Sequence, residues 1–158
     1  MRKASRAIVG AAMIVGLSGP AGAAGEGLSG FQLVDIQVDV PRAQGTPCQI
    51  NDGLLRQRII EKLQTSGVGV GTSALTLRAS VTTLSDAIQR RCISAVRLEA
   101  FTAQTTVIQA TRNSITANIP LWSVTSIASS DARGHSERMG SAVAILSDKF
   151  VAVFKANR

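Results

Sequence analysis

The chain has 158 residues, with 17 Lys and Arg against 10 Asp and Glu and a net charge of +7. Aromatic residues are only 3% of the chain, so platforms for stacking bases are lacking and we expect no nucleic-acid partner. Three of the basic residues lie within the first six positions. Residues 24–158 therefore carry 14 of the 17 basic residues against all 10 acidic ones, which weakens the case for nucleic acid further.

The first 23 residues have the three parts of a secretory signal peptide. Basic residues precede the uncharged run 7–17, which is followed by Pro20 and by small residues up to Ala23. The run is well short of the roughly 20 residues that span a bilayer, so cleavage after Ala23 is expected, not an uncleaved anchor. Pro20 stands where a bacterial lipoprotein has its acylated cysteine. We expect a periplasmic or secreted protein without a lipid anchor or transmembrane segment.

The remaining chain is the size of one domain. We expect a flexible start at 24–30 and a single domain over 31–158. Its two cysteines, Cys48 and Cys92, are far apart in sequence, and in an oxidising compartment they most simply form one disulfide. A zinc or redox site is the weaker alternative, because the chain has no CxxC and a single histidine. We predict neither a metal nor a cofactor.

The first half of this domain predicts a strand and then a helix. Apolar and polar residues alternate over 31–40 and end at Pro41, as in a half-buried strand. Asn51 and Asp52 suit a helix N-cap, and Gly67 suits a helix end. Between them one apolar face is formed by Leu55, Ile59 and Leu63. The glycines of 67–71 predict a connector, since a phosphate loop would need a strand before it and a helix after it.

Three strands and a helix are predicted in the second half. The strands are expected at 75–82, from Cys92 to about residue 107, and at 115–124, where Pro120 requires an edge or a bulge. The last helix is marked by an apolar stripe with spacings of four and three, and Ser136 or Asp131 is expected to cap it. The stripe consists of Met139, Val143, Leu146, Phe150 and Val153.

The predicted fold class is α+β, a two-layer sandwich in the order strand, helix, three strands, helix. Consecutive strands joined by short turns pair as an antiparallel meander, and both amphipathic helices must cover one face of the sheet. The result is a mainly antiparallel sheet without internal repeats.

Several segments carry a resemblance to known proteins. They are 53–67, Ser94–Glu99, the strand with Trp122, and 148–157. The chain resembles a group of short, exported, uncharacterised bacterial proteins, and its topology is similar to that of the lipopolysaccharide-assembly lipoproteins and the amino-terminal domain of TolB. This resemblance implies a non-catalytic domain that binds a partner. Those lipoproteins carry an acylated cysteine, whereas this chain has Pro20 at that place.

Two groups of residues are candidate sites. His135 lies near Asp131 and Ser136, which would suit a small hydrolase, but a solvated loop before the last helix is the favoured interpretation. Arg78 and Arg97 lie opposite the apolar rows of their strands, and with Trp122 they are a candidate partner surface.

The favoured hypothesis is a non-catalytic binding or assembly module of the cell envelope that uses its sheet face or an edge strand. The alternatives are a binder of anionic envelope polymers through the arginines and a hydrolase built on His135. The expected partner is an envelope protein or such a polymer, and no catalytic residue is assigned.

Overall fold

The computed structural model describes residues 27–41, 47–86, 88, 91–108 and 113–158. The predicted signal peptide and its cleavage site after Ala23 lie outside the described residues.

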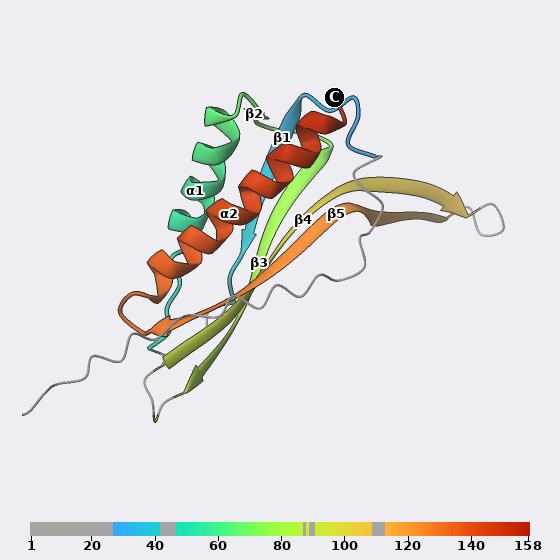
Figure 1. Ribbon diagram of the computed structural model, residues 1–158. Helices are drawn as coiled ribbons and strands as arrows, with labels where there is room; N and C mark the ends of the chain where they lie inside the picture. Colours follow the sequence, from blue (N-terminus) through green and yellow to red (C-terminus); the bar gives the residue numbers. More distant parts are fainter. Residues whose placement is uncertain (1–26, 42–46, 87, 89–90, 109–112) are drawn as a thin grey trace, which may run out of the picture.

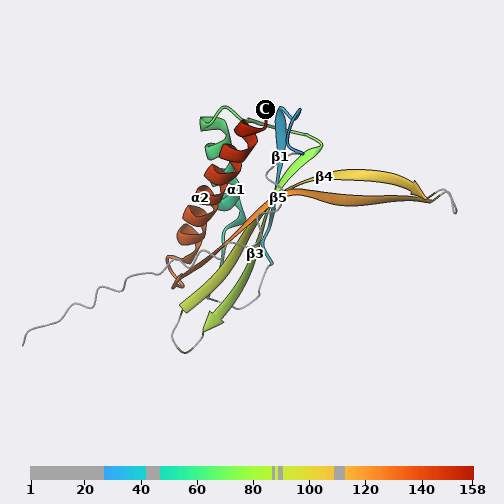
Figure 2. The ribbon, with the colours of Figure 1, turned by 45° about the vertical axis from the view of Figure 1, so that its right-hand side comes forward.

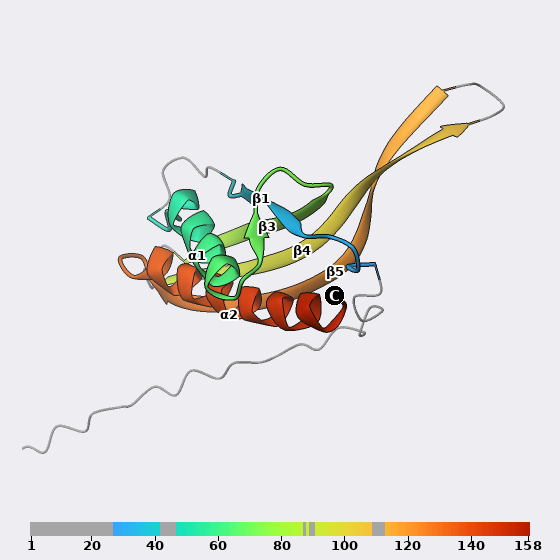
Figure 3. The same cartoon turned by 90° about the horizontal axis from the view of Figure 1, so that it is seen from above.

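The described chain forms one five-stranded sheet and two helices (Figure 1). The elements are β1 (Leu33–Asp39), α1 (Asp52–Thr65), β2 (Gly69–Val70), β3 (Leu75–Asp86), β4 (Arg91–Ile108), β5 (Asn113–Asp131) and α2 (His135–Ala156). Both helices lie on the same face of the sheet, which Figure 2 shows from the side and Figure 3 from above. The predicted two-layer α+β architecture is confirmed.

The sheet has the strand order β2-β1-β3-β4-β5. The meander of β3, β4 and β5 is antiparallel as predicted, whereas β1 pairs in parallel with both β2 and β3. One strand was missed: Gly69 and Val70 pair with Leu33 and Val34, inside the segment predicted as a plain connector. Two residues are too few for a periodic signal, so alternation could not reveal it.

Helix α1 begins and ends where capping chemistry places it. The side chain of Asn51 accepts a hydrogen bond from the Leu54 amide at 3.0 Å, and the chain leaves the helix at Gly67 with a φ of 73°. Glycine adopts this left-handed conformation without a steric penalty. The predicted apolar face of α1 is confirmed, since its three members are fully buried.

The core lies between the helices and the sheet. Four of the five residues predicted as the stripe of α2 are buried, Val153 is partly buried, and Phe154 joins them. Leu28 is also fully buried. The packed structure therefore begins before residue 31, inside the segment expected to be flexible.

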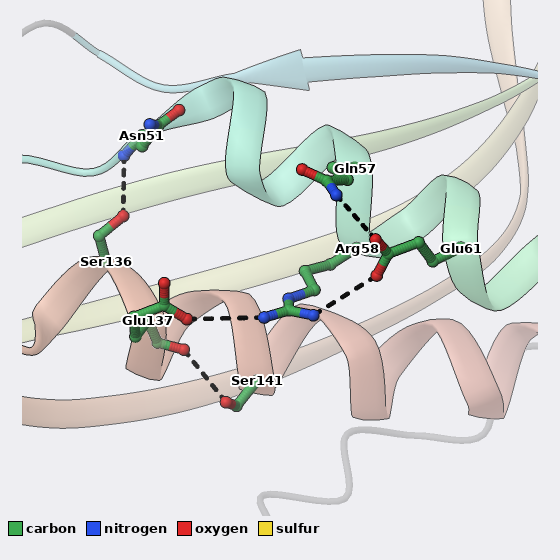
Figure 4. A network of polar contacts seen from close by, with 7 residues as sticks. All are labelled: Asn51, Gln57, Arg58, Glu61, Ser136, Glu137 and Ser141. Carbon is green, nitrogen blue, oxygen red and sulfur yellow. Dashed lines mark hydrogen bonds and ion pairs between the residues drawn. The ribbon is translucent and has the colours of Figure 1, made fainter.

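Polar contacts join the two helices on their outer side (Figure 4). The guanidinium of Arg58 reaches Glu61 on its own helix at 3.4 Å and Glu137 on α2 at 3.7 Å. The Asn51 amide donates to Ser136 Oγ at 3.1 Å. These side chains are substantially exposed, and exposed ion pairs contribute little each. They orient the helix layer, while the buried stripes hold it on the sheet.

The start of α2 differs from the prediction. Gly134 is its N-cap and no side chain caps the helix. Asp131 instead accepts a hydrogen bond from the Gly134 amide at 2.9 Å within the turn, and Ser136 lies inside the helix. Asp131 is the last residue of β5, so the solvated loop predicted before the helix is reduced to a turn of three residues, Ala132 to Gly134.

The predicted disulfide is present. Cys48 and Cys92 are bonded at an S–S distance of 2.01 Å, which ties the segment before α1 to the start of β4. Both cysteines are buried. Disulfides of this kind persist in oxidising compartments, which is consistent with an extracytoplasmic protein.

Candidate functional site

Strand β5 is an edge strand with a bulge, as Pro120 requires. Trp122 pairs with Ala100 and Pro120 with Phe101, so Leu121 is the extra residue on β5. Proline has no N–H to donate to a ladder and therefore favours an edge or a bulge. This position has both, which confirms the prediction.

Beyond the bulge, β4 and β5 leave the domain as a two-stranded ribbon. Strand β3 ends its pairing at Thr102, so no other described strand flanks the pairs from Ala103 and Asn118 to Ile108 and Asn113. We call these six pairs the distal arm. It projects past the end of the helix layer in all three views (Figures 1, 2 and 3). At roughly 3.4 Å per residue it extends about 20 Å beyond the last pair with β3.

The distal arm is exposed on both faces and carries no charge among its described residues. Each side chain from Ala103 to Val107 and from Asn113 to Asn118 is exposed, including Ile115 at 52% and Val107 at 58%. Thr105 and Thr116 hydrogen-bond across the ribbon at 2.8 Å. A two-stranded ribbon is marginally stable in water, and exposed edge strands are ordinarily protected by charge. Among the described residues, the arm has neither a third strand nor a charge.

The uncovered sheet face holds the predicted arginines, but they are not a free cationic patch. The Arg78 guanidinium forms an ion pair with Glu99, and Arg97 pairs with the same carboxylate at 3.1 Å. Arg78 also lies over the ring of Phe101, 4.9 Å from its centroid. Glu99 is only 12% exposed, and its one carboxylate offsets part of the charge of the two guanidinium groups.

The strand register places further charged side chains on the same face of the sheet. The described basic residues of this face are three, whereas its described acidic residues are five. The basic residues are Arg78, Arg91 and Arg97, and the acidic ones are Asp35, Asp39, Asp86, Glu99 and Asp131. The positive surface anticipated for anionic polymers is therefore not formed by these residues.

Trp122 lies on the opposite face from the two arginines. Its ring packs against Phe150 of α2, with 5.4 Å between the centroids. It is partly buried at the edge of the core. The structure therefore does not bring Arg78, Arg97 and Trp122 together, and the interpretation of Trp122 as packing is the one that the geometry supports.

His135 is fully buried within a chain of hydroxyl groups. Its Nε2 lies 2.7 Å from Ser94 Oγ, and its Nδ1 lies 2.9 Å from Ser130 Oγ. Ser94 in turn contacts Thr83 Oγ1 at 2.7 Å. Because Ser130 donates its proton to the Asp131 carbonyl at 3.0 Å, Nδ1 must be the nitrogen that carries hydrogen. Nε2 then accepts from Ser94, and Thr83 donates to Ser94.

This hydroxyl chain has part of the geometry of a nucleophile and base. Catalysis would further need a group that orients the histidine and an exposed serine. The orienting partner here is a serine, the Asp131 carboxylate contacts the Gly134 amide, and both Ser94 and His135 have no exposed surface. Desolvation lowers the pKa of His135 from its ordinary value of 6.5. The imidazole is therefore held neutral, which suits a satisfied buried network.

Sequence reasoning missed the partners of His135 and the distal arm. Ser94 alternates with Val96 and Leu98 on β4 and therefore lies on the same buried face. A buried hydroxyl that needs a hydrogen-bond partner could have been predicted from this spacing. The arm also has a signal, since Arg112 is the one charged residue of the sequence between Ala100 and Ser130.

Two further observations apply only to the part of the chain that the structure describes. No helix there is long and apolar enough to cross a membrane. No group of three or more His, Cys, Asp or Glu side chains in that part is arranged to hold a metal ion.

No family model matches the sequence, and no curated protein matches it significantly. Solved structures with a related arrangement include a minor lipoprotein from Acinetobacter baumannii, at 12% identity and a TM-score of 0.45, covering 82% of this chain and 95% of that one. The PelC dodecamer from Paraburkholderia phytofirmans has 14% identity and a TM-score of 0.47, covering 87% and 97%. A Xanthomonas campestris protein of family DUF330 has 15% identity and a TM-score of 0.42, covering 80% and 87%. At these values no family is assigned, and the resemblance to the lipopolysaccharide-assembly lipoproteins and TolB stays a prediction.

Proposed function

We propose that this protein is a non-catalytic binding or assembly module of the cell envelope, acting in the periplasm or after secretion. The observation that carries the proposal is the distal arm. The domain builds a complete core beneath two helices and then extends one hairpin beyond it, where the hairpin packs on none of the described helices. An exposed ribbon of this kind contributes little to its own fold and is suited to pairing with another strand.

The compartment is supported by two features of the chain. The sequence begins with the predicted signal peptide, and the domain contains the Cys48–Cys92 disulfide. Among the described residues of the arm, the exposed Val107 and Ile115 supply apolar contact area to a partner, while its edges supply main-chain donors and acceptors.

A hydrolase remains the alternative that a specific observation favours, namely the 2.7 Å contact between Ser94 Oγ and His135 Nε2. The two proposals differ in which variant abolishes function. In the first variant, Ser94→Ala, the hydroxyl that contacts Nε2 is removed. In the second, Ala103 is joined to Asn118 by an Asn-Gly turn, which suits a two-residue hairpin and removes the arm.

The test is complementation of a strain that lacks the gene, with both variants exported and checked for the native disulfide. We expect Ser94→Ala to restore the wild-type phenotype and the shortened protein to fail. If Ser94→Ala is folded but inactive while the shortened protein complements, the binding proposal is wrong and the hydrolase proposal gains support.

A further inference from the structure

We infer that the occupant of the distal arm is a second copy of this chain, bound by antiparallel pairing of the β5 edges at Asn113–Ile119. This inference rests on the proposed function and names its partner. Its starting point is that no described strand pairs with the outer edge of β5 or, past Thr102, with the outer edge of β4. Strand β5 is the last strand of the sheet, and β4 loses its neighbour β3 after Thr102.

The described residues of the arm do not favour an occupant that is recognised through charge. Of the described residues from Ala100 to Ser130, none is charged. A polyanion, an anionic lipid surface or an acidic peptide would find no counter-charge on these residues, although such partners are recognised mainly through charge. What the arm offers from Ser114 to Asn118 is main chain that no described strand pairs on its outer side, together with β-branched side chains. An occupant must therefore supply a strand of its own.

A second copy supplies such a strand with matched chemistry. When two identical edges meet about a two-fold axis, they are antiparallel, and each donor on one finds the corresponding acceptor on the other. Like charges facing each other would oppose this pairing, and Asn113–Ile119 has none. Pairing centred on Thr116 places Ile115 and Ile119 on one face of the ribbon and Thr116 on the other. These β-branched side chains pack well on a pleated surface.

Pro120 limits the pairing to the arm. It has no N–H, so a ladder along the β5 edge is interrupted there. The bulge at Leu121 also turns β5 at this point. Asn113–Ile119 is thus the uninterrupted stretch of the edge that lies clear of the helix layer. Paired arms would form a four-stranded sheet, which meets the usual requirement of three or more strands for a stable ribbon.

Sedimentation velocity of the mature, oxidised protein between about 1 and 200 µM tests this inference, and the chain offers a matched control. Ile115 on the arm is 52% exposed, and Ile145 on α2 is 57% exposed. Ile115→Lys places a charge beside the two-fold axis, whereas Ile145→Lys makes the same change on a helix. We expect wild type and Ile145→Lys to dimerise equally, and Ile115→Lys to dissociate at least tenfold more readily. The shortened variant should be a monomer.

Fluorescence of Trp122, the only tryptophan, reports whether each variant retains the packing against Phe150. A monomeric wild type across this range, or self-association that Ile115→Lys leaves unchanged, would overturn the inference. The proposed function fails separately, through complementation by the shortened protein. If the arm is required in the cell while the purified protein is monomeric, the occupant is a strand from another envelope protein and not a second copy.

Discussion

Replacing His135 by alanine should cost stability at neutral pH and remove part of the pH dependence of folding. The ring is fully buried and holds Ser94 and Ser130. Its loss leaves the buried Ser94 hydroxyl without an acceptor, which costs roughly 1–3 kcal/mol. Lost packing in the space of the ring adds to this. We expect His135→Ala to lower the free energy of unfolding by roughly 3–5 kcal/mol at pH 8.

The sign of the pH effect follows from the lowered pKa. The imidazole in the folded protein is harder to protonate than in the unfolded chain, where its pKa is near 6.5. Below pH 6.5 the unfolded chain binds the proton first, so the wild-type protein loses stability as pH falls toward the folded-state pKa. The slope reaches about 1.4 kcal/mol per pH unit at most. His135→Ala lacks this contribution, so the difference between the two proteins should shrink from pH 8 to pH 5.

Urea unfolding at pH 8, 7, 6 and 5, followed by the fluorescence of Trp122, measures both effects. Carboxylates contribute equally to both proteins and cancel in the comparison. Ser130→Ala is the matched control, because it removes the hydrogen bonds of Ser130 to His135 and to the Asp131 carbonyl while keeping the titrating ring. Equal stability of wild type and His135→Ala at pH 8, or a difference that grows as pH falls, would refute the buried neutral network.

Three further outcomes are expected. Replacing Cys48 and Cys92 by serine opens a loop with a sequence separation of 44 and should lower the free energy of unfolding by about 4 kcal/mol in urea titrations, whereas an unchanged midpoint would contradict the role of the disulfide. Glu99→Gln leaves two guanidinium groups without their shared carboxylate and should cost about 1–3 kcal/mol, a loss that thermal unfolding detects and that 1 M salt should reduce if it is electrostatic. The intact mass of the exported protein should match residues 24–158, and a full-length or acylated product would disprove the predicted cleavage after Ala23.

The elements with strong periodicity were predictable from the sequence. Helix α1 repeats its apolar residues every four positions between a capping Asn51 and a terminating Gly67, and the structure has it there. The disulfide followed from two cysteines, and the irregular edge followed from Pro120. In these cases the chemistry of particular residues determines the structure, so it can be predicted without knowing how the rest of the chain packs.

The extension of the arm beyond the sheet and the His135 network were not predicted, for two different physical reasons. The network joins Thr83, Ser94, Ser130 and His135 from three strands and a helix, and only the register of the sheet brings them together. The arm was predicted as strand only in part, because Thr and Gln residues on both faces blur the alternation that a half-buried strand shows. Because neither face of the arm is buried, its sequence shows no regular alternation of apolar and polar residues.

The position of the bulge explains why the arm and the core can be altered separately. Strand β5 lies in two environments. Trp122 and Val124 pack toward the helices, whereas Asn113–Asn118 are exposed. Pro120 and Leu121 lie at the boundary between them. A substitution on the arm therefore removes little buried area. A substitution at Trp122, on the core side of the bulge, disturbs the packing against Phe150. If the arm is a contact surface, its substitutions should alter association while stability stays within the roughly 0.5 kcal/mol typical of surface positions. A variant of the arm that no longer associates but keeps its stability has therefore lost binding and not folding.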